Sequence, residues 1–140
     1  MNNPSLAAAI KWPKLKRFNR GFEKLARVYN GDVSRLSDVC RFSLYFDTFT
    51  DLTQALGIIV TDTDIKVERV KCRLSVKFDA SHTAGYRDIM LNLKISNDYI
   101  CALGCETHAC EVQLVLRSFG ELKTASGHNH YVLFRDIRGE

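Results

Sequence analysis

The chain of 140 residues is 46% hydrophobic and 26% charged, with two prolines and eight glycines, as is typical of one soluble globular domain. This composition excludes a collagen-like, low-complexity or disordered chain. A chain of this length buries roughly two-thirds of its unfolded surface, enough for a core without disulfides or a metal. The longest apolar run, residues 55–60, is too short to span a bilayer, so we expect no membrane partner.

The net charge of +4 is distributed unevenly along the chain. Residues 1–37 carry eight basic and two acidic side chains, a net charge of +6. Residues 38–140 carry twelve basic and fourteen acidic side chains, a net charge of −2. A basic segment that precedes a nearly neutral body favours a partner that carries phosphate groups.

Five cysteines, an odd number, occur in a sequence that begins without a secretory signal. We therefore expect no disulfide framework and a reducing, intracellular compartment, most simply the cytoplasm. Four side chains that can act as soft metal ligands lie within ten residues and could bind zinc tetrahedrally: Cys101, Cys105, His108 and Cys110. The favoured alternative places Cys110 in an alternating strand with its thiol in the core, because zinc sites usually pair a tight knuckle with distant ligands.

The first predicted element is an amphipathic helix over residues 11–29, which follows a flexible leader at residues 1–10. Its apolar residues recur at steps of three and four and share one face: Leu15, Phe18, Phe22, Leu25 and Tyr29. The opposite face gathers four basic residues: Lys16, Arg20, Lys24 and Arg27. We expect the apolar face to pack and the basic face to point outward. An Asn-Gly-Asp turn at residues 30–32 ends the helix.

The rest of the chain alternates between strand and helix patterns. Apolar patterning predicts strands at residues 39–46, 65–71, 74–78, 88–96 and 109–116, and residues 131–134 close the chain. Helices are predicted at residues 52–59 and 119–125, and a loop at residues 79–85. The order predicts one α/β (α+β) domain at residues 11–140, with a mixed five-stranded sheet flanked by helices.

Three polar residues interrupt or flank these apolar strands and are the candidate reactive groups. Asp38 precedes the first strand, while Glu111 and Gln113 share the face of a later strand that points away from the core. If the two strands are neighbours, Asp38 and Glu111 could bind one divalent cation, as chemistry on nucleotide phosphates requires. The alternative is that each is an ordinary solvated residue of an exposed sheet face.

The loop that ends in Gly85 presents a second candidate site. An aromatic ring at Tyr86, at the start of a strand, could stack on a base, and Arg87 could reach a phosphate. Alternatively, Tyr86 packs in the core and Arg87 pairs with Asp88. The residues alone leave both interpretations open.

In order, these segments resemble a known family. The DVCR segment (residues 38–41), GYRD (residues 85–88) and EVQL (residues 111–114) are similar to motifs in the synthetase domain of the RelA/SpoT family, the alarmone synthetases. The resemblance covers about residues 11–138. Residues 29–38 and 110–135 look most like a divergent branch of this fold.

The resemblance implies a magnesium-dependent transfer of pyrophosphate from ATP to the ribose 3′-hydroxyl of a guanine nucleotide, or of an RNA end. It makes Asp38 the Mg²⁺ ligand and Glu111 the second acidic residue, with Gln113 in the same catalytic segment. It places Tyr86 against the guanine. The remaining residues that it assigns to nucleotide binding are Lys14, Lys16, Arg20, Lys24, Arg41, Lys71, Arg73, Arg87, Arg117 and His128.

Several positions depart from the pattern of the family. Lys14 replaces an arginine that stacks on adenine, and Cys72, Met90 and Val115 replace polar or basic residues. These departures favour the second hypothesis, a module that keeps the fold and binds a nucleotide, an RNA or a protein partner without much turnover. Such a module could also be one piece of a larger parent chain.

Overall fold

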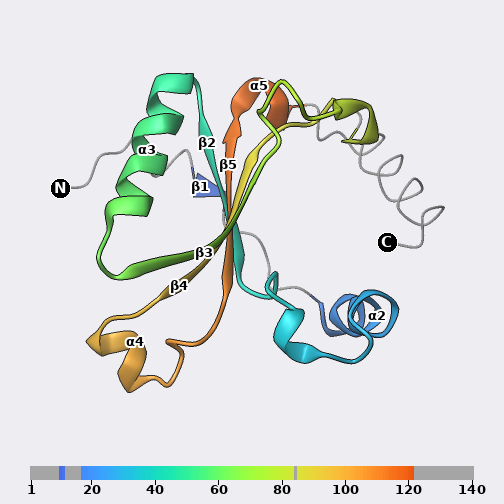
Figure 1. Ribbon diagram of the computed structural model, residues 1–140, viewed down its shortest axis with the longest axis vertical. Helices are drawn as coiled ribbons and strands as arrows, with labels where there is room; N and C mark the ends of the chain where they lie inside the picture. Colours follow the sequence, from blue (N-terminus) through green and yellow to red (C-terminus); the bar gives the residue numbers. More distant parts are fainter. Residues whose placement is uncertain (1–9, 12–16, 84, 122–140) are drawn as a thin grey trace.

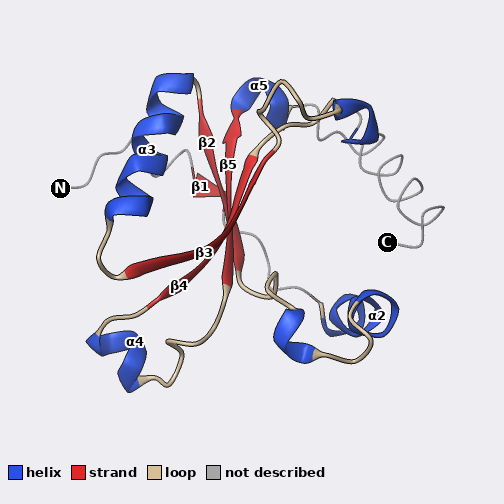
Figure 2. Ribbon diagram, in the orientation of Figure 1, coloured by secondary structure: helices blue, strands red, loops and turns tan. Residues whose placement is uncertain are grey.

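The computed structural model describes residues 10–11, 17–83 and 85–121. Within these residues the strands form one sheet in the order β1-β2-β5-β4-β3 (Figures 1 and 2). The strands are β1 (Ile10–Lys11), β2 (Arg41–Phe46), β3 (Ile65–Cys72), β4 (Ile89–Ile95) and β5 (Cys110–Leu116). The helices are α2 (Phe18–Val28), α3 (Phe49–Thr61), α4 (Asp98–Ala102) and α5 (Arg117–Gly120).

The sheet is mixed, which confirms the predicted fold class. β2 runs parallel to β5, whereas the pairs β1–β2, β4–β5 and β3–β4 are antiparallel. The four longer strands lie where alternation predicted them. A parallel neighbour for β2 requires a long crossover, and residues 47–109 supply it through α3, β3, β4 and α4.

The strand predicted at residues 74–78 is wrong, because this segment forms turns. The guanidinium of Arg87 donates to the carbonyl oxygens of Arg73 (3.0 Å), Ser75 (2.9 Å) and Phe78 (3.1 Å), acceptors that a sheet partner would otherwise use. The fifth strand is instead β1, in which Ile10 pairs with Leu44. β1 also corrects the start of the first helix, since it includes Lys11 and α2 begins at Phe18.

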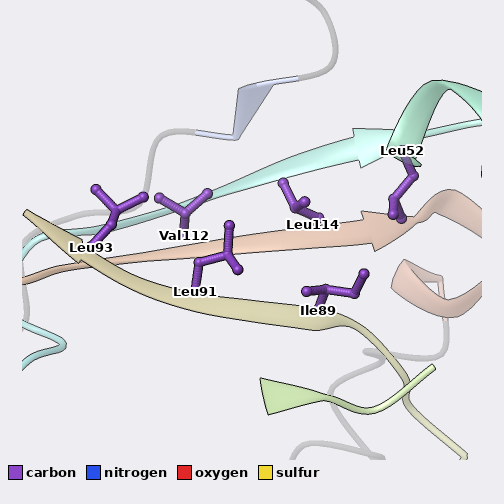
Figure 3. Packing of buried hydrophobic residues seen from close by; sticks show 6 residues of the cluster. All are labelled: Leu52, Ile89, Leu91, Leu93, Val112 and Leu114. Atoms are coloured by element: carbon purple, nitrogen blue, oxygen red, sulfur yellow. The ribbon is translucent and has the colours of Figure 1, made fainter. Parts of the chain in front are cut away.

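The core lies between the sheet and α3. It gathers alternate residues of β4 and β5 with one helical leucine, as Figure 3 shows: Leu52, Ile89, Leu91, Leu93, Val112 and Leu114. Thr48 caps α3, because its hydroxyl oxygen accepts a hydrogen bond from the Asp51 backbone N–H at 3.1 Å. The predicted helix at residues 52–59 is therefore present and longer. The short α4, capped by Asn97, was not predicted.

Helix α2 lies across the sheet from α3 (Figure 1). Its packing differs from the prediction, because the apolar Phe18 and Phe22 are 83% and 62% exposed while Gly21 is buried beside Leu36. The turn that follows has Asn30 and Gly31 at positive φ (49° and 84°), as predicted. Among the described helices, none has the length and apolar character needed to cross a membrane.

Candidate functional site

The face of the sheet opposite α3 carries the candidate polar residues. Alternation sends the core residues of β4 and β5 to one face, so the residues between them point to the other. The strand register places Arg41, Glu111 and Asn92 in one row across β2, β5 and β4. Glu111 and Asn92 are only 9% and 6% exposed. A carboxylate and an amide are thus buried side by side on the second face.

A chain of hydrogen bonds fixes the carboxylate of Glu111. The Ser43 hydroxyl donates to Gln113 Oε1 at 3.2 Å, and Gln113 Nε2 donates to Glu111 Oε1 at 2.9 Å. Because Ser43 occupies the amide oxygen, the amide NH₂ faces the carboxylate. Gln113 therefore orients Glu111, and one oxygen of a buried carboxylate is satisfied from within β5.

Asp38 lies in the turn before β2 and is 7% exposed. The neighbouring Ser37 accepts a hydrogen bond from Asn92 Nδ2 at 3.3 Å, which ties this turn to β4. Since Asn92 is paired in register with Glu111, the turn lies at the end of the sheet that carries Glu111. The structure thus brings both predicted carboxylates to the same end of the same sheet.

Lys24 of α2 contacts this end directly. Its ammonium donates to Asp38 Oδ2 at 3.0 Å and lies 5.2 Å from the centre of the Tyr29 ring. Burial acts to lower the pKa of Lys24, but the hydrogen bonds and charges of Tyr29 and Asp38 outweigh burial and raise the pKa above its ordinary value. One member of the predicted basic face thus points inward and neutralises a site carboxylate.

A second polar cluster lies where β3 ends and β4 begins. Asp88, fully buried, accepts two hydrogen bonds from the Arg73 guanidinium, at 2.6 and 2.7 Å. That guanidinium lies 5.8 Å from the centre of the Tyr86 ring. Burial, followed by the charge of Asp88 and a hydrogen bond to it, raises the pKa of Tyr86, so the phenol stays protonated. The partner of Asp88 is therefore Arg73, which corrects the alternative that paired it with Arg87.

The remaining predicted site residues are spread over the molecule. Arg41 and Lys71 are exposed on β2 and β3, and Arg20 is exposed on α2, 3.4 Å from Glu23. Arg117 is exposed and lies 2.7 Å from Asp47. Lys14, Lys16 and His128 lie outside the described residues.

Eight of the described site residues fall into two groups. Lys24, Asp38, Arg41, Glu111 and Gln113 gather at one end of the second face. The other group, at Arg73, Tyr86 and Arg87, adjoins the start of β4, which pairs with Leu114 rather than with Glu111. Three residues of strand separate these levels, about 10 Å.

Sequence reasoning missed three residues of the site. Ser37, Ser43 and Asn92 were not singled out, yet each hydrogen-bonds within or beside the carboxylate group. The available signal was the polar Asn92 between Leu91 and Leu93 in an otherwise apolar strand. A serine at position 37 or 43 carries no comparable signal, because serine is common on any surface.

For magnesium, the chemistry of the donors fits. Mg²⁺ is usually bound by one or two carboxylates together with water and substrate phosphates, and Asp38 and Glu111 supply two hard oxygen donors. Across the described residues, no three His, Cys, Asp or Glu side chains gather as a metal cluster, so the zinc ligands proposed at residues 101–110 do not converge. Cys110 packs against the core, as its strand position predicts.

Comparisons with known proteins identify the fold. Neither a protein-family model nor a curated protein sequence matches the chain. Among solved structures, small alarmone synthetase 1 from Bacillus subtilis, bound to its product pppGpp, is similar, with a TM-score of 0.66 and 17% identity over 84% of this chain and 60% of its own. A GTP pyrophosphokinase family protein from Streptococcus pneumoniae gives a TM-score of 0.64 and 17% identity over 87% of this chain and 57% of its own.

Small alarmone synthetase 2 from Bacillus subtilis also matches, with a TM-score of 0.64 and 15% identity over 86% of this chain and 61% of its own. The chain has the fold of the small alarmone synthetases, which confirms the fold that the RelA/SpoT resemblance implied. It spans about three-fifths of the length of these structures.

Proposed function

We propose that the second face of the sheet binds ATP and a guanine nucleotide and transfers pyrophosphate from ATP to the ribose 3′-hydroxyl of the acceptor. The observation that carries this proposal is the buried carboxylate pair, Asp38 and Glu111, each held by a hydrogen bond at the same end of an alarmone-synthetase fold. The pppGpp bound in the Bacillus subtilis synthetase 1 supports a guanine nucleotide as acceptor. The reaction consumes nucleotides of the cytoplasm, where we locate the protein.

In this reaction the bond between the β-phosphorus of ATP and its α–β bridging oxygen breaks, and AMP leaves with that oxygen. The 3′-oxygen of the acceptor forms the new bond to the β-phosphorus and loses its proton. Glu111 is the group that accepts this proton, because Gln113 holds its carboxylate in one orientation through one of its two oxygens. Such transfer depends mostly on positioning and on neutralising charge.

Asp38 and Glu111 would hold Mg²⁺, which when bound neutralises charge on the polyphosphate. Lys24 donates a hydrogen bond to Asp38, so its ammonium group would lie beside a phosphate bound at Asp38. The ring of Tyr86 would stack on the guanine, and the Arg73 guanidinium lies beside that ring. The other proposed phosphate ligands are basic residues around this face: Lys14, Lys16, Arg20, Arg41, Lys71, Arg87, Arg117 and His128.

The test is incubation of purified protein with Mg²⁺, γ-labelled ATP and, in separate reactions, GDP, GTP or tRNA. The label moves to the acceptor in the wild type and is lost in Asp38→Ala and Glu111→Ala. Asp98→Ala, which removes an exposed carboxylate of α4, is the matched control and keeps the activity. Equal label on the acceptor with wild type and both site variants would contradict the proposal, and label on tRNA alone would identify an RNA end as acceptor.

A second candidate function is binding without turnover. It is favoured by the ion pair of Lys24 with Asp38, which already neutralises a carboxylate that turnover would need for Mg²⁺. A module that binds nucleotide or RNA through basic residues loses affinity steeply as salt increases. Arg20→Ala with Arg41→Ala would weaken such binding further, whereas salt-independent binding would exclude this function.

A further inference from the structure

Cys40 and Cys110 lie side by side where two neighbouring parallel strands begin. Arg41 is paired in register with Glu111, and the Glu111 backbone N–H donates to the Cys40 carbonyl oxygen at 2.9 Å. Cys40 and Cys110 each precede these paired residues by one position, so they are adjacent across the strands and share a face. The Cys40 thiol lies close enough to the Cys110 thiol to contribute to raising its pKa.

The surroundings of the two thiols differ in a way that suits a reaction between them. Cys40 is exposed to solvent, whereas Cys110 is partly buried against the core. An exposed thiol meets an oxidant first, and a protected neighbouring thiol can then react with the product.

We propose that Cys40 and Cys110 are a site of reversible oxidation to an intrachain disulfide, with a peroxide as the oxidant. The peroxide oxidises the Cys40 thiol to a sulfenic acid and is reduced to water or an alcohol. The Cys110 sulfur then attacks the Cys40 sulfur, a sulfur–sulfur bond forms, and the hydroxyl leaves as a second water with the Cys110 proton. A dithiol reductant reverses the reaction by thiol–disulfide exchange.

The proposed bond would join β2 and β5 at the end of the sheet that carries Asp38 and Glu111. It would close a loop of about 70 residues, and cross-links that close long loops restrict the unfolded chain strongly. The oxidised protein is therefore more resistant to heat. This inference does not depend on the proposed function, since it rests on the register of two strands and on two thiols.

The test is to treat the dilute reduced protein with hydrogen peroxide, block free thiols with iodoacetamide and map the linked peptides by mass spectrometry. Trypsin cleaves after Arg35 and Arg41, and a glutamate-specific protease cleaves after Glu106 and Glu111. Cys40 and Cys110 then fall in separate short peptides, apart from Cys101 and Cys105. We expect these two peptides to be joined, with a loss of about 2 Da relative to the two free thiols.

Variants and heat stability make the test sharper. Cys40→Ser and Cys110→Ser abolish the link, whereas Cys72→Ser, which removes an exposed cysteine at the end of β3, keeps it. Oxidation should raise the melting temperature of the wild type by at least about 5 °C, and dithiothreitol should reverse the rise. The proposal is overturned if Cys40 and Cys110 both stay open to alkylation, or if the link joins another pair of cysteines.

Discussion

Asp88 is a fully buried charged residue whose stability depends on one ion pair. Its side chain is fully buried at the start of β4, and Arg73 binds both of its carboxylate oxygens. A buried charge that loses its partner keeps the cost of leaving water and gains nothing in return. The ion pair therefore holds the segment between β3 and β4 and, with it, the position of Tyr86.

Arg73→Met should lower the free energy of unfolding by about 3–5 kcal/mol, because it leaves Asp88 charged, buried and unpaired. Urea unfolding followed by circular dichroism measures this loss. Arg117→Met is the matched control, since its pair with Asp47 is exposed and screened by solvent, so its loss should be much smaller. The double variant Arg73→Met with Asp88→Asn should recover part of the loss, and a loss below about 1 kcal/mol in Arg73→Met would contradict this role.

The pKa of the Cys110 thiol is raised above the ordinary value for cysteine. Burial, followed by the neighbouring Cys40, raises its pKa from 9.0 to about 11. Because the fold holds this proton more tightly than the unfolded chain does, the contribution to stability is present below pH 9 and is lost as the pH rises through about 11. Alkylation of Cys110 in the reduced protein should keep accelerating with pH until about 11, but level off near 9 in urea. Equal profiles would contradict the shift.

At the scale of elements, α3 completes the core on the face of the sheet opposite the site. Leu52, fully buried, is where the helix contacts the cluster of aliphatic side chains from β4 and β5 (Figure 3). The opposite side of the same helix is solvated, and Ile58 is 68% exposed. One helix thus offers a core position and a surface position for comparison.

Leu52→Ala should lower the free energy of unfolding by about 2–5 kcal/mol, since it removes buried methyl groups and leaves a cavity. Ile58→Ala should change it by less than about 0.5 kcal/mol. Thermal or urea unfolding of the two variants side by side checks the contrast. Similar losses in both would mean that α3 packs through a different face.

Alternation predicted the strands that pair within the sheet, but it could not show which alternating segments have a partner in the sheet. The strands around Leu91 and Leu114 follow directly from their alternating apolar residues. By contrast, residues 74–78 also alternate between apolar and polar side chains, yet they form turns in which Arg87 binds the carbonyl oxygens of Ser75 and Phe78. The outward Phe18 of α2 was equally unpredictable, since the period of a helix defines its faces without saying which one packs.

For the whole molecule, the fold and the positions of the two carboxylates followed from the sequence, while the pairing of charges around them did not. Alternation placed Asp38 and Glu111 beside two strands, and the RelA/SpoT resemblance implied that the two residues share a site. The strand order shows that these strands are neighbours. The contact of Lys24 with Asp38 joins residues 14 positions apart across a turn. Such contacts depend on how α2 is placed, which no local pattern encodes.

The central claim is that Asp38 and Glu111 form a magnesium-dependent nucleotide site, and its most direct test is calorimetric titration with a non-hydrolysable ATP analogue, with and without Mg²⁺. In the wild type, Mg²⁺ should tighten binding at least about tenfold, equivalent to about 1.4 kcal/mol. In Asp38→Asn with Glu111→Gln this enhancement should vanish, whereas Asp98→Asn, on exposed α4, should retain it. Equal enhancement in the site variant, or no binding by the wild type, would contradict the claim.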